Sequence, residues 1–160
     1  MAQAPKAFML HGFIGSGKTT LARQLEQQHG ALRFTHDEWM SRLYGQDPPA
    51  ADFADHARRI HGVMEVMWTR CLAIGTSVIL DLGFWSRAER HRIRSLIIDH
   101  GGEALLYDVQ CPDHVARQRV QDRNRAVADG LYIASQSFDV LHTRFEALTP
   151  DESRIEYVSA

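Results

Sequence analysis

The sequence has few cysteines, no long hydrophobic run and no histidine cluster. Its two cysteines, Cys71 and Cys111, lack CxxC spacing, which predicts buried, reduced thiols and excludes a scaffold held together by disulfides. No apolar run approaches the roughly 18 residues of a membrane span, and the first residues lack the pattern of a secretory signal. The nine histidines show no HExxH or other zinc-ligand spacing. We therefore expect a cytoplasmic protein without membrane partners or a zinc site.

An excess of one charge is also absent. The 18 Lys and Arg residues and the 20 Asp and Glu residues give a net charge of -2, which excludes a strongly basic nucleic-acid coat and an acidic tail. Only Lys6 and Lys18 are lysines, so a lysine inside a motif is informative. The length of 160 residues, with 44% apolar and 24% charged residues, is typical of one soluble globular domain, here 1–160.

Apolar runs and helical periodicities alternate along nearly the whole chain. Five apolar runs predict strands, at 6–12, 31–36, 75–84, 103–111 and 154–159. Helical spacing predicts helices between them, the last at about 135–148 and the longest at about 52–73. The longest helix places on one apolar stripe Ile60, Val63, Met64, Met67 and Cys71. This alternation predicts an α/β fold with a largely parallel, five-stranded sheet and helices on both faces.

A glycine-rich segment between the first predicted strand and helix is the strongest functional signal. Residues 12–19 match GxxxxGK[ST] in full. Glycines let backbone N–H groups wrap phosphates without Cβ clashes, Lys18 can reach the β and γ phosphates, and the Thr19 hydroxyl can bind Mg²⁺. The alternative is a glycine-rich turn that binds nothing. The expected nucleotide-binding residues of this phosphate loop are Gly12, Phe13, Ile14, Gly15, Ser16, Gly17, Lys18, Thr19 and Thr20.

Three further segments accompany the phosphate loop: THDEW at 35–39, VILDLGFWSRAER at 78–90 and ARQRVQDRNR at 116–125. With them, the sequence resembles the P-loop kinase group that includes zeta toxins, chloramphenicol phosphotransferase and the 5′-kinase domain of phage polynucleotide kinase, as well as bacterial ATP-binding proteins of similar size. The resemblance runs from residue 6 to about 152. It implies a three-layer P-loop NTPase fold, ATP as the phosphoryl donor, and a short arginine-rich lid at about 112–133 that Gly130 could hinge. It does not specify the acceptor.

Asp37 follows the second predicted strand, where open α/β sheets bind their ligands. Phosphoryl transfer to a hydroxyl uses a carboxylate that orients the acceptor and takes its proton. Asp37 matches the aspartate with this role in the kinases that the sequence resembles. Helix capping, together with Thr35, is the alternative role. Trp39 and Arg42 follow closely and could contact the acceptor beside Asp37, by stacking and by ion pairing. The alternative for each is core packing or a solvated helix face.

Asp81 ends the apolar run of the third predicted strand. A buried strand that delivers a carboxylate in this way typically serves Mg²⁺ or its waters, so Asp81 and Thr19 are the expected metal ligands. A charge that leaves an apolar strand needs a partner, and Lys18 or the metal would supply it. The alternative is an aspartate that only caps the following turn. Ser86, three residues before Glu89, is expected to cap a helix.

Arg119 and Arg123 lie four residues apart and therefore on one face of a predicted helix. In the kinases that the sequence resembles, a mobile lid after the fourth strand supplies arginines to the ATP phosphates, and these two match that pattern. Such donors neutralise the charge that develops on the transferred phosphoryl group. The alternative is a solvated helix face paired with Asp113 and Asp122. The expected catalytic residues are Lys18, Asp37, Arg119 and Arg123.

The sequence thus predicts a Mg²⁺-dependent kinase that transfers the γ-phosphoryl group of ATP to a hydroxyl or phosphate of a small acceptor. Two alternatives stay open. One is a polynucleotide 5′-hydroxyl kinase, which the weak overall charge disfavours because a strand-binding groove needs a basic stripe. The other is a regulatory ATPase that acts through a partner. ATP rather than GTP is expected from the resemblance, and the oligomeric state is open between monomer and homodimer.

Overall fold

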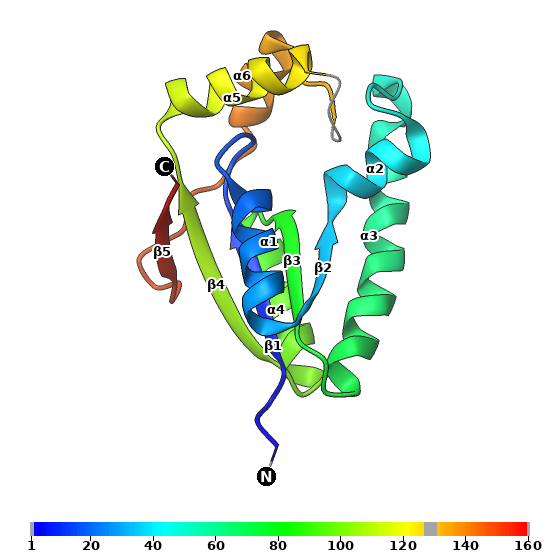
Figure 1. The fold of residues 1–160 in the computed structure, drawn as a ribbon, viewed down its shortest axis with the longest axis vertical. Helices are drawn as coiled ribbons and strands as arrows, with labels where there is room; N and C mark the ends of the chain where they lie inside the picture. Colours follow the sequence, from blue (N-terminus) through cyan, green and yellow to red (C-terminus); the bar gives the residue numbers. More distant parts are fainter. Residues whose placement is uncertain (1, 127–130, 160) are drawn as a thin grey trace.

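The computed structural model describes residues 2–126 and 131–159, along which strands and helices alternate (Figure 1). The strands are β1 (Lys6–His11), β2 (Leu32–Thr35), β3 (Val78–Gly83), β4 (Glu103–Gln110) and β5 (Ile155–Val158). The helices are α1 (Lys18–His29), α2 (His36–Tyr44), α3 (Ala50–Ala73), α4 (Arg87–Asp99), α5 (Asp113–Arg125) and α6 (Ser135–His142). The predicted α/β fold is confirmed, although the last helix ends at His142 rather than near residue 148.

All five strands are parallel and form one sheet in the order β2-β3-β1-β4-β5. The central strand is β1, in which Phe8 lies opposite Ile79 of β3 on one side and Leu105 of β4 on the other. Because both faces and both edges of β1 are covered, its sequence is almost continuously apolar rather than alternating. The carboxyl ends of β1, β2 and β3 meet at one end of the sheet, where open parallel sheets bind ligands.

Successive side chains of β1 enter two different cores, because strand residues alternate between the faces of a sheet. Phe8 and Leu10 pack with Leu21 and Leu25 of α1 on one face. Met9 faces a larger core on the opposite side, to which α2, α3 and α4 contribute. Figure 1 shows α1 in front of the sheet and α4 behind it. The expected three-layer arrangement of a P-loop fold is therefore confirmed.

The buried stripe of α3 differs from the expected one. Trp68 and Leu72 are buried, with 1% and 2% exposure, and they continue the row that begins at Ile60. Val63 and Met67, which were expected on the apolar stripe, are instead 54% and 42% exposed. The Trp68 indole has the largest apolar area to bury. Bringing it into the core turns Val63 and Met67 toward solvent.

Helices α5 and α6 lie beyond the carboxyl ends of the strands, above the phosphate loop that follows β1 (Figure 1). A third core joins Phe13 of that loop to Ala116, Val120 and Phe138 of the two helices. The expected lid at 112–133 thus contains α5. Its residues 127–130, with the expected hinge Gly130, lie outside the described residues.

The two cysteines were expected to be buried, reduced thiols. Cys71 and Cys111 are free thiols, as expected, but each is only partly buried, so the prediction of full burial is wrong. Cys71 lies in the last turn of α3 and packs against the larger core, and Cys111 follows β4 and packs against the third core. Within residues 2–126 and 131–159, no helix has the length and apolar character needed to cross a membrane.

Candidate active site

The phosphate loop, between β1 and α1, has steric constraints that only glycine satisfies. A Cβ on Gly15 would lie 2.5 Å from the Ala116 carbonyl oxygen, and the φ of Gly15 is +78°. A Cβ on Gly12 would lie 2.6 Å from Ser16 Oγ. No side chain caps the N-terminus of α1, so the positive end of its dipole is directed at the loop. The loop therefore has the shape and polarity of an anion cradle.

Lys18 opens α1 and turns its side chain back over the phosphate loop. Its Nζ donates a hydrogen bond to the Phe13 carbonyl oxygen at 2.8 Å. Burial lowers the pKa of Lys18 below its ordinary value. The carboxylates of Asp81 and Asp37 oppose this shift of the pKa, and the charge of Arg123 adds to it. The ammonium group is thus within electrostatic reach of charged residues from β3, α2 and α5.

Asp81 of β3 is 5% exposed and is held by two threonine hydroxyls. Thr19 Oγ1 donates to its Oδ2 at 2.7 Å, and Thr35 Oγ1 donates to the same oxygen at 3.1 Å. Burial raises the pKa of Asp81, although Lys18 and the two hydroxyls favour its ionised form. The carboxylate is therefore a desolvated group whose charge is only partly compensated.

Thr35 and Arg33 belong to the site although sequence reasoning assigned neither a role at Asp81. Thr35 lies opposite Asp81 in the parallel register of β2 and β3. Arg33 Nη1 donates to Thr35 Oγ1 at 2.7 Å and forms ion pairs with Glu26 and Glu38 at 3.1 and 2.8 Å. A threonine or arginine in a short strand has no distinctive spacing, so only the strand register reveals this contact.

Asp37 lies in the first turn of α2, with its side chain 49% exposed. The N-cap of this helix is Thr35, whose side chain makes no capping hydrogen bond to the residues that the structure describes, so the helix-cap alternative is wrong. Desolvation raises the pKa of Asp37, but a hydrogen bond from His36 Nδ1 at 3.2 Å and the charges of Lys18 and Arg123 outweigh it. The net pKa of Asp37 lies below its ordinary value, so the group is a carboxylate at neutral pH.

The two expected lid arginines occupy different positions on α5. Arg119 Nη1 donates to the Gly15 carbonyl oxygen at 3.3 Å and to Ser159 Oγ at 2.9 Å. Arg119 therefore fastens the phosphate loop to the end of β5. Arg123 is partly buried, and its Nε has no hydrogen-bond partner in the part of the chain that the structure describes. Its charge acts instead on Lys18.

The acidic residues expected as alternative partners of these arginines form other pairs. Asp113 lies 3.7 Å from His142, and Asp122 lies 3.9 Å from Arg125. A neighbouring arginine, Arg117, is joined to α6 by an ion pair of 2.6 Å. The pairs of Asp113 and Arg117 connect α5 with α6, whereas the pair of Asp122 lies within α5.

The structure does not bring Trp39 or Arg42 to Asp37. The Arg42 side chain is 71% exposed and lies 3.9 Å from Glu38. Trp39 is partly buried against the larger core, with its ring 6.3 Å from that of Phe34. A helix turns by about 100° per residue, so positions 37, 39 and 42 face different directions. Neighbours in sequence on α2 are therefore separated in space.

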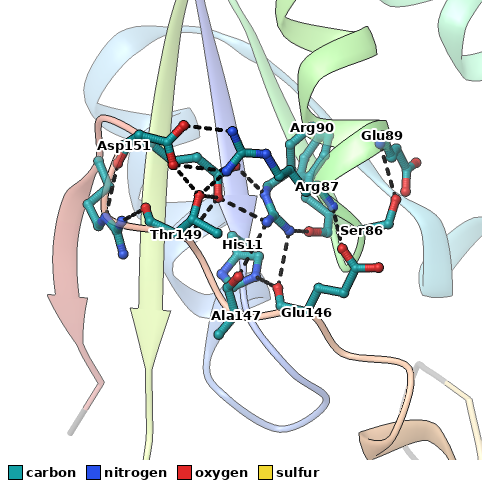
Figure 2. A network of polar contacts seen from close by, with 12 residues as sticks. His11, Ser86, Arg87, Glu89, Arg90, Glu146, Ala147, Thr149 and Asp151 are labelled. Carbon is teal, nitrogen blue, oxygen red and sulfur yellow. Dashed lines mark hydrogen bonds and ion pairs between the residues drawn. The ribbon is translucent and has the colours of Figure 1, made fainter.

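The turn after β3 is strained and is held from two sides. Phe84 has a φ of +52°, a left-handed conformation that non-glycine residues rarely adopt. Trp85 Nε1 donates to the Gly12 carbonyl oxygen at 3.2 Å, and Arg90 Nη1 donates to the Phe84 carbonyl oxygen at 2.8 Å. The Arg90 guanidinium also makes two hydrogen bonds to Glu152, of 2.7 and 3.0 Å. Figure 2 shows Arg90 at the centre of this polar network.

Two other residues of this network have structural roles (Figure 2). Ser86 caps α4, as predicted, because its Oγ accepts a hydrogen bond from the Glu89 backbone N–H at 3.1 Å. His11 is buried at the end of β1, with Nδ1 3.3 Å from Asp108 and Nε2 3.2 Å from the Glu146 carbonyl oxygen. Burial lowers the pKa of His11. Both residues stabilise the segments that border the phosphate loop.

Comparison with known proteins finds a matching family and solved structures of similar fold. The AAA_33 family, described as an AAA domain, matches residues 8–148. No curated protein matches the chain. A candidate kinase from Chloroflexus aurantiacus j-10-fl is 16% identical, over 98% of this chain and 88% of that one, with a TM-score of 0.79. A sugar kinase from Janibacter sp. HTCC2649 is 20% identical, over 96% and 84%, with a TM-score of 0.65. The Mycobacterium tuberculosis APS kinase CysC, in complex with AMPPNP and APS, is 20% identical, over 95% and 92%, with a TM-score of 0.58.

Proposed function

The chain belongs to the AAA_33 family of AAA domains, and on this basis we propose that it is a magnesium-dependent kinase that transfers the γ-phosphoryl group of ATP to a hydroxyl or phosphate group of a small acceptor. The observation that carries the proposal is a convergence of four charged side chains from four elements. They are Lys18 of α1, Asp37 of α2, Asp81 of β3 and Arg123 of α5. Phosphoryl transfer needs cations around the phosphates, a metal-binding carboxylate and an acceptor-orienting carboxylate, and this set contains each of them.

The phosphate loop and its neighbours are the proposed ATP site. The glycine cradle and the uncapped N-terminus of α1 favour an anion. Burial of Lys18 makes its charge costly in the free protein, so a polyphosphate beside it gains more than it would beside a solvated lysine. Arg119 supports the loop backbone at Gly15, and Arg123 directs a second positive charge toward Lys18. The arginines would then neutralise the charge that grows on the transferred phosphoryl group.

Thr19 and Asp81 are the proposed magnesium ligands. The Thr19 hydroxyl donates a hydrogen bond to Asp81, which leaves the lone pairs of the hydroxyl oxygen for a metal. Among residues 2–126 and 131–159, no group of three or more His, Cys, Asp or Glu side chains could hold a metal ion. Phosphate and water oxygens would therefore complete the coordination, as is usual for Mg²⁺. Bound Mg²⁺ neutralises charge on the phosphates during transfer.

Asp37 is the proposed acceptor-side residue. Its carboxylate is half-exposed, ionised and within electrostatic reach of Lys18 and Arg123. It would accept a hydrogen bond from the acceptor hydroxyl, orient its oxygen toward the γ-phosphorus, and take the proton as the new P–O bond forms. ADP would leave with the electron pair of the broken P–O bond.

The test is ADP release from Mg·ATP by the purified protein and by Asp37→Asn. Acceptors would be nucleosides, nucleotides, sugars, aminoglycoside and phenicol antibiotics, and a 5′-hydroxyl oligonucleotide. Acceptor-dependent ADP release that Asp37→Asn abolishes, with ATP binding retained, is the expected result. Transfer confined to the oligonucleotide would favour a polynucleotide kinase. ATP binding with no response to any acceptor and no effect of Asp37→Asn would contradict the kinase proposal and favour a regulatory ATPase.

A further inference from the structure

His36 precedes Asp37 and forms its closest polar contact. The imidazole Nδ1 lies 3.2 Å from Asp37 Oδ1. An ionised carboxylate only accepts hydrogen bonds, so Nδ1 must carry the proton and donate it. The His36 side chain is 12% exposed, whereas that of Asp37 is 49% exposed. A largely buried imidazole thus contacts one carboxylate oxygen of Asp37, while about half of the Asp37 side chain is exposed to solvent.

The His36 ring is oriented by packing. The His61 ring of α3 meets it edge to face, with centroids 4.7 Å apart and planes at 84°. Phe53, also of α3, lies at 6.4 Å and 64°. His36 Nε2 is buried and makes no hydrogen bond to any described residue. In the Nδ1–H tautomer, Nε2 carries a lone pair, and an unpaired acceptor is tolerated more often than an unpaired N–H.

Charged groups face the His36–Asp37 pair from three other helices. Lys18 of α1 and Arg123 of α5 act on Asp37, and Glu89 of α4 is within electrostatic reach of His36. The carboxylate is therefore hydrogen-bonded to an imidazole and lies within electrostatic reach of two cations. A free aspartate side chain in the first turn of a helix has several rotamers, and the hydrogen bond from His36 favours the one seen here.

We propose that His36 is a positioning residue for Asp37, which holds the carboxylate toward Lys18 and Arg123 through the Nδ1–H hydrogen bond, with α3 fixing the ring through His61 and Phe53. The catalytic importance of this contact rests on the proposed function, but the contact itself does not. This role makes α3 part of the acceptor side of the proposed active site, because the His61 and Phe53 rings orient the imidazole that holds the Asp37 carboxylate. The sequence alone does not reveal this role, since a histidine beside an aspartate has no diagnostic spacing.

Two substitutions separate hydrogen bonding by Nδ1 from the rest of the ring. In His36→Asn, the amide nitrogen can occupy the place of Nδ1 and donate to Asp37. In His36→Gln, the amide reaches the place of Nε2 and leaves the Nδ1 position empty. The carboxyl carbon of Asp37, assigned by its loss in Asp37→Asn, is titrated by ¹³C NMR in each protein. We expect the pKa of Asp37 to stay low in His36→Asn and to rise toward the ordinary carboxyl range in His36→Gln.

Long-range ¹H–¹⁵N spectra of the unsubstituted protein should show His36 as the Nδ1–H tautomer. An Nε2–H tautomer, or an Asp37 pKa that responds equally to both substitutions or to neither, would overturn the proposal. These measurements need no acceptor, so they remain decisive even if the kinase proposal fails. If it holds, His36→Gln should lower kcat by up to about 100-fold with little change in the KM for ATP, and His36→Asn should lower it less. The exposed His91 of α4 provides the control, and His91→Gln should change neither readout.

Discussion

Thr19 Oγ1 donates a hydrogen bond to Asp81 Oδ2 over 2.7 Å, which joins the first turn of α1 to the buried strand β3. The same oxygen accepts a hydrogen bond from Thr35 at the end of β2. Three segments that are distant in sequence thus converge on one desolvated carboxylate. A protein maintains such a carboxylate at a cost in stability, and a bound cation would offset that cost.

Asp81→Asn should separate function from stability. Asparagine keeps an oxygen for Thr19 and Thr35 but removes the buried charge. Burial raises the pKa of Asp81, so the ionised form at pH 7 costs stability that asparagine does not. We expect Mg²⁺-dependent ADP release to fall by about 100-fold or more, while the melting temperature without ligand stays equal or rises. Calorimetry with and without Mg·ATP gives the melting temperatures of both proteins. A lower melting temperature of the ligand-free variant would contradict the prediction.

Lys18→Ala should remove most ATP turnover, because the ammonium neutralises charge that grows on the phosphates. A loss of about 100- to 1000-fold is typical when one such donor is removed. The chain contains a matched control, since its other lysine, Lys6, begins β1 at the opposite end of the strand. Lys6→Ala should leave ADP release and ATP affinity unchanged. Equal effects of the two substitutions would show that the assigned phosphate site is wrong.

Arg90→Met should destabilise the protein strongly, because Arg90 and Glu152 form an ion pair with side chains only 2% and 8% exposed. Breaking a buried pair from one side typically costs about 3 to 5 kcal/mol. The matched control is Arg92→Met, since Arg92 is 56% exposed in its pair with Glu65 and should contribute less than about 1 kcal/mol. Urea unfolding of both variants at pH 7 gives the comparison, and similar losses would refute the buried-pair explanation.

Acid should weaken that pair in a predictable direction. The hydrogen bonds of Arg90 lower the pKa of Glu152 from 4.5 to about 2. A carboxyl group with a lowered pKa in the folded state contributes stability above its unfolded pKa and loses it as the pH falls toward the folded value. The difference in stability between the unsubstituted protein and Glu152→Gln should therefore shrink between pH 4.5 and about 2.

His61 should destabilise the fold in mild acid. Burial, reinforced by the charges of His36 and Arg92, lowers its pKa from 6.5 to about 4. The unfolded chain binds a proton below pH 6.5 that the folded chain resists until about pH 4, so stability falls across this range, by roughly 2 kcal/mol at pH 5. Urea unfolding at pH 7 and pH 5 should show a smaller loss for His61→Gln. An identical pH dependence of the two proteins would disprove this contribution.

Local features of this protein follow from short stretches of sequence. The glycines at 12, 15 and 17 and the lysine at 18 define a phosphate loop because backbone conformation depends on the residue itself and its nearest neighbours. The same locality explains why Ser86 could be predicted as a helix cap and the five strands could be placed within a few residues. The α/β fold then follows from the alternation of the elements.

Contacts between distant segments could not be predicted in this way. The register of β2 against β3 brings Thr35 opposite Asp81, and the rotation of α2 carries Arg42 into solvent while Asp37 turns toward Lys18. On α3, the burial of Trp68 exposed two residues that periodicity had placed on the apolar stripe. The structure places Asp37 after β2 and Asp81 within β3 rather than at its end. The sequence by itself determined the phosphate loop and the order of the elements. Only the tertiary structure decided which of their side chains meet, because strand register and helix rotation depend on packing between residues that are far apart in the chain.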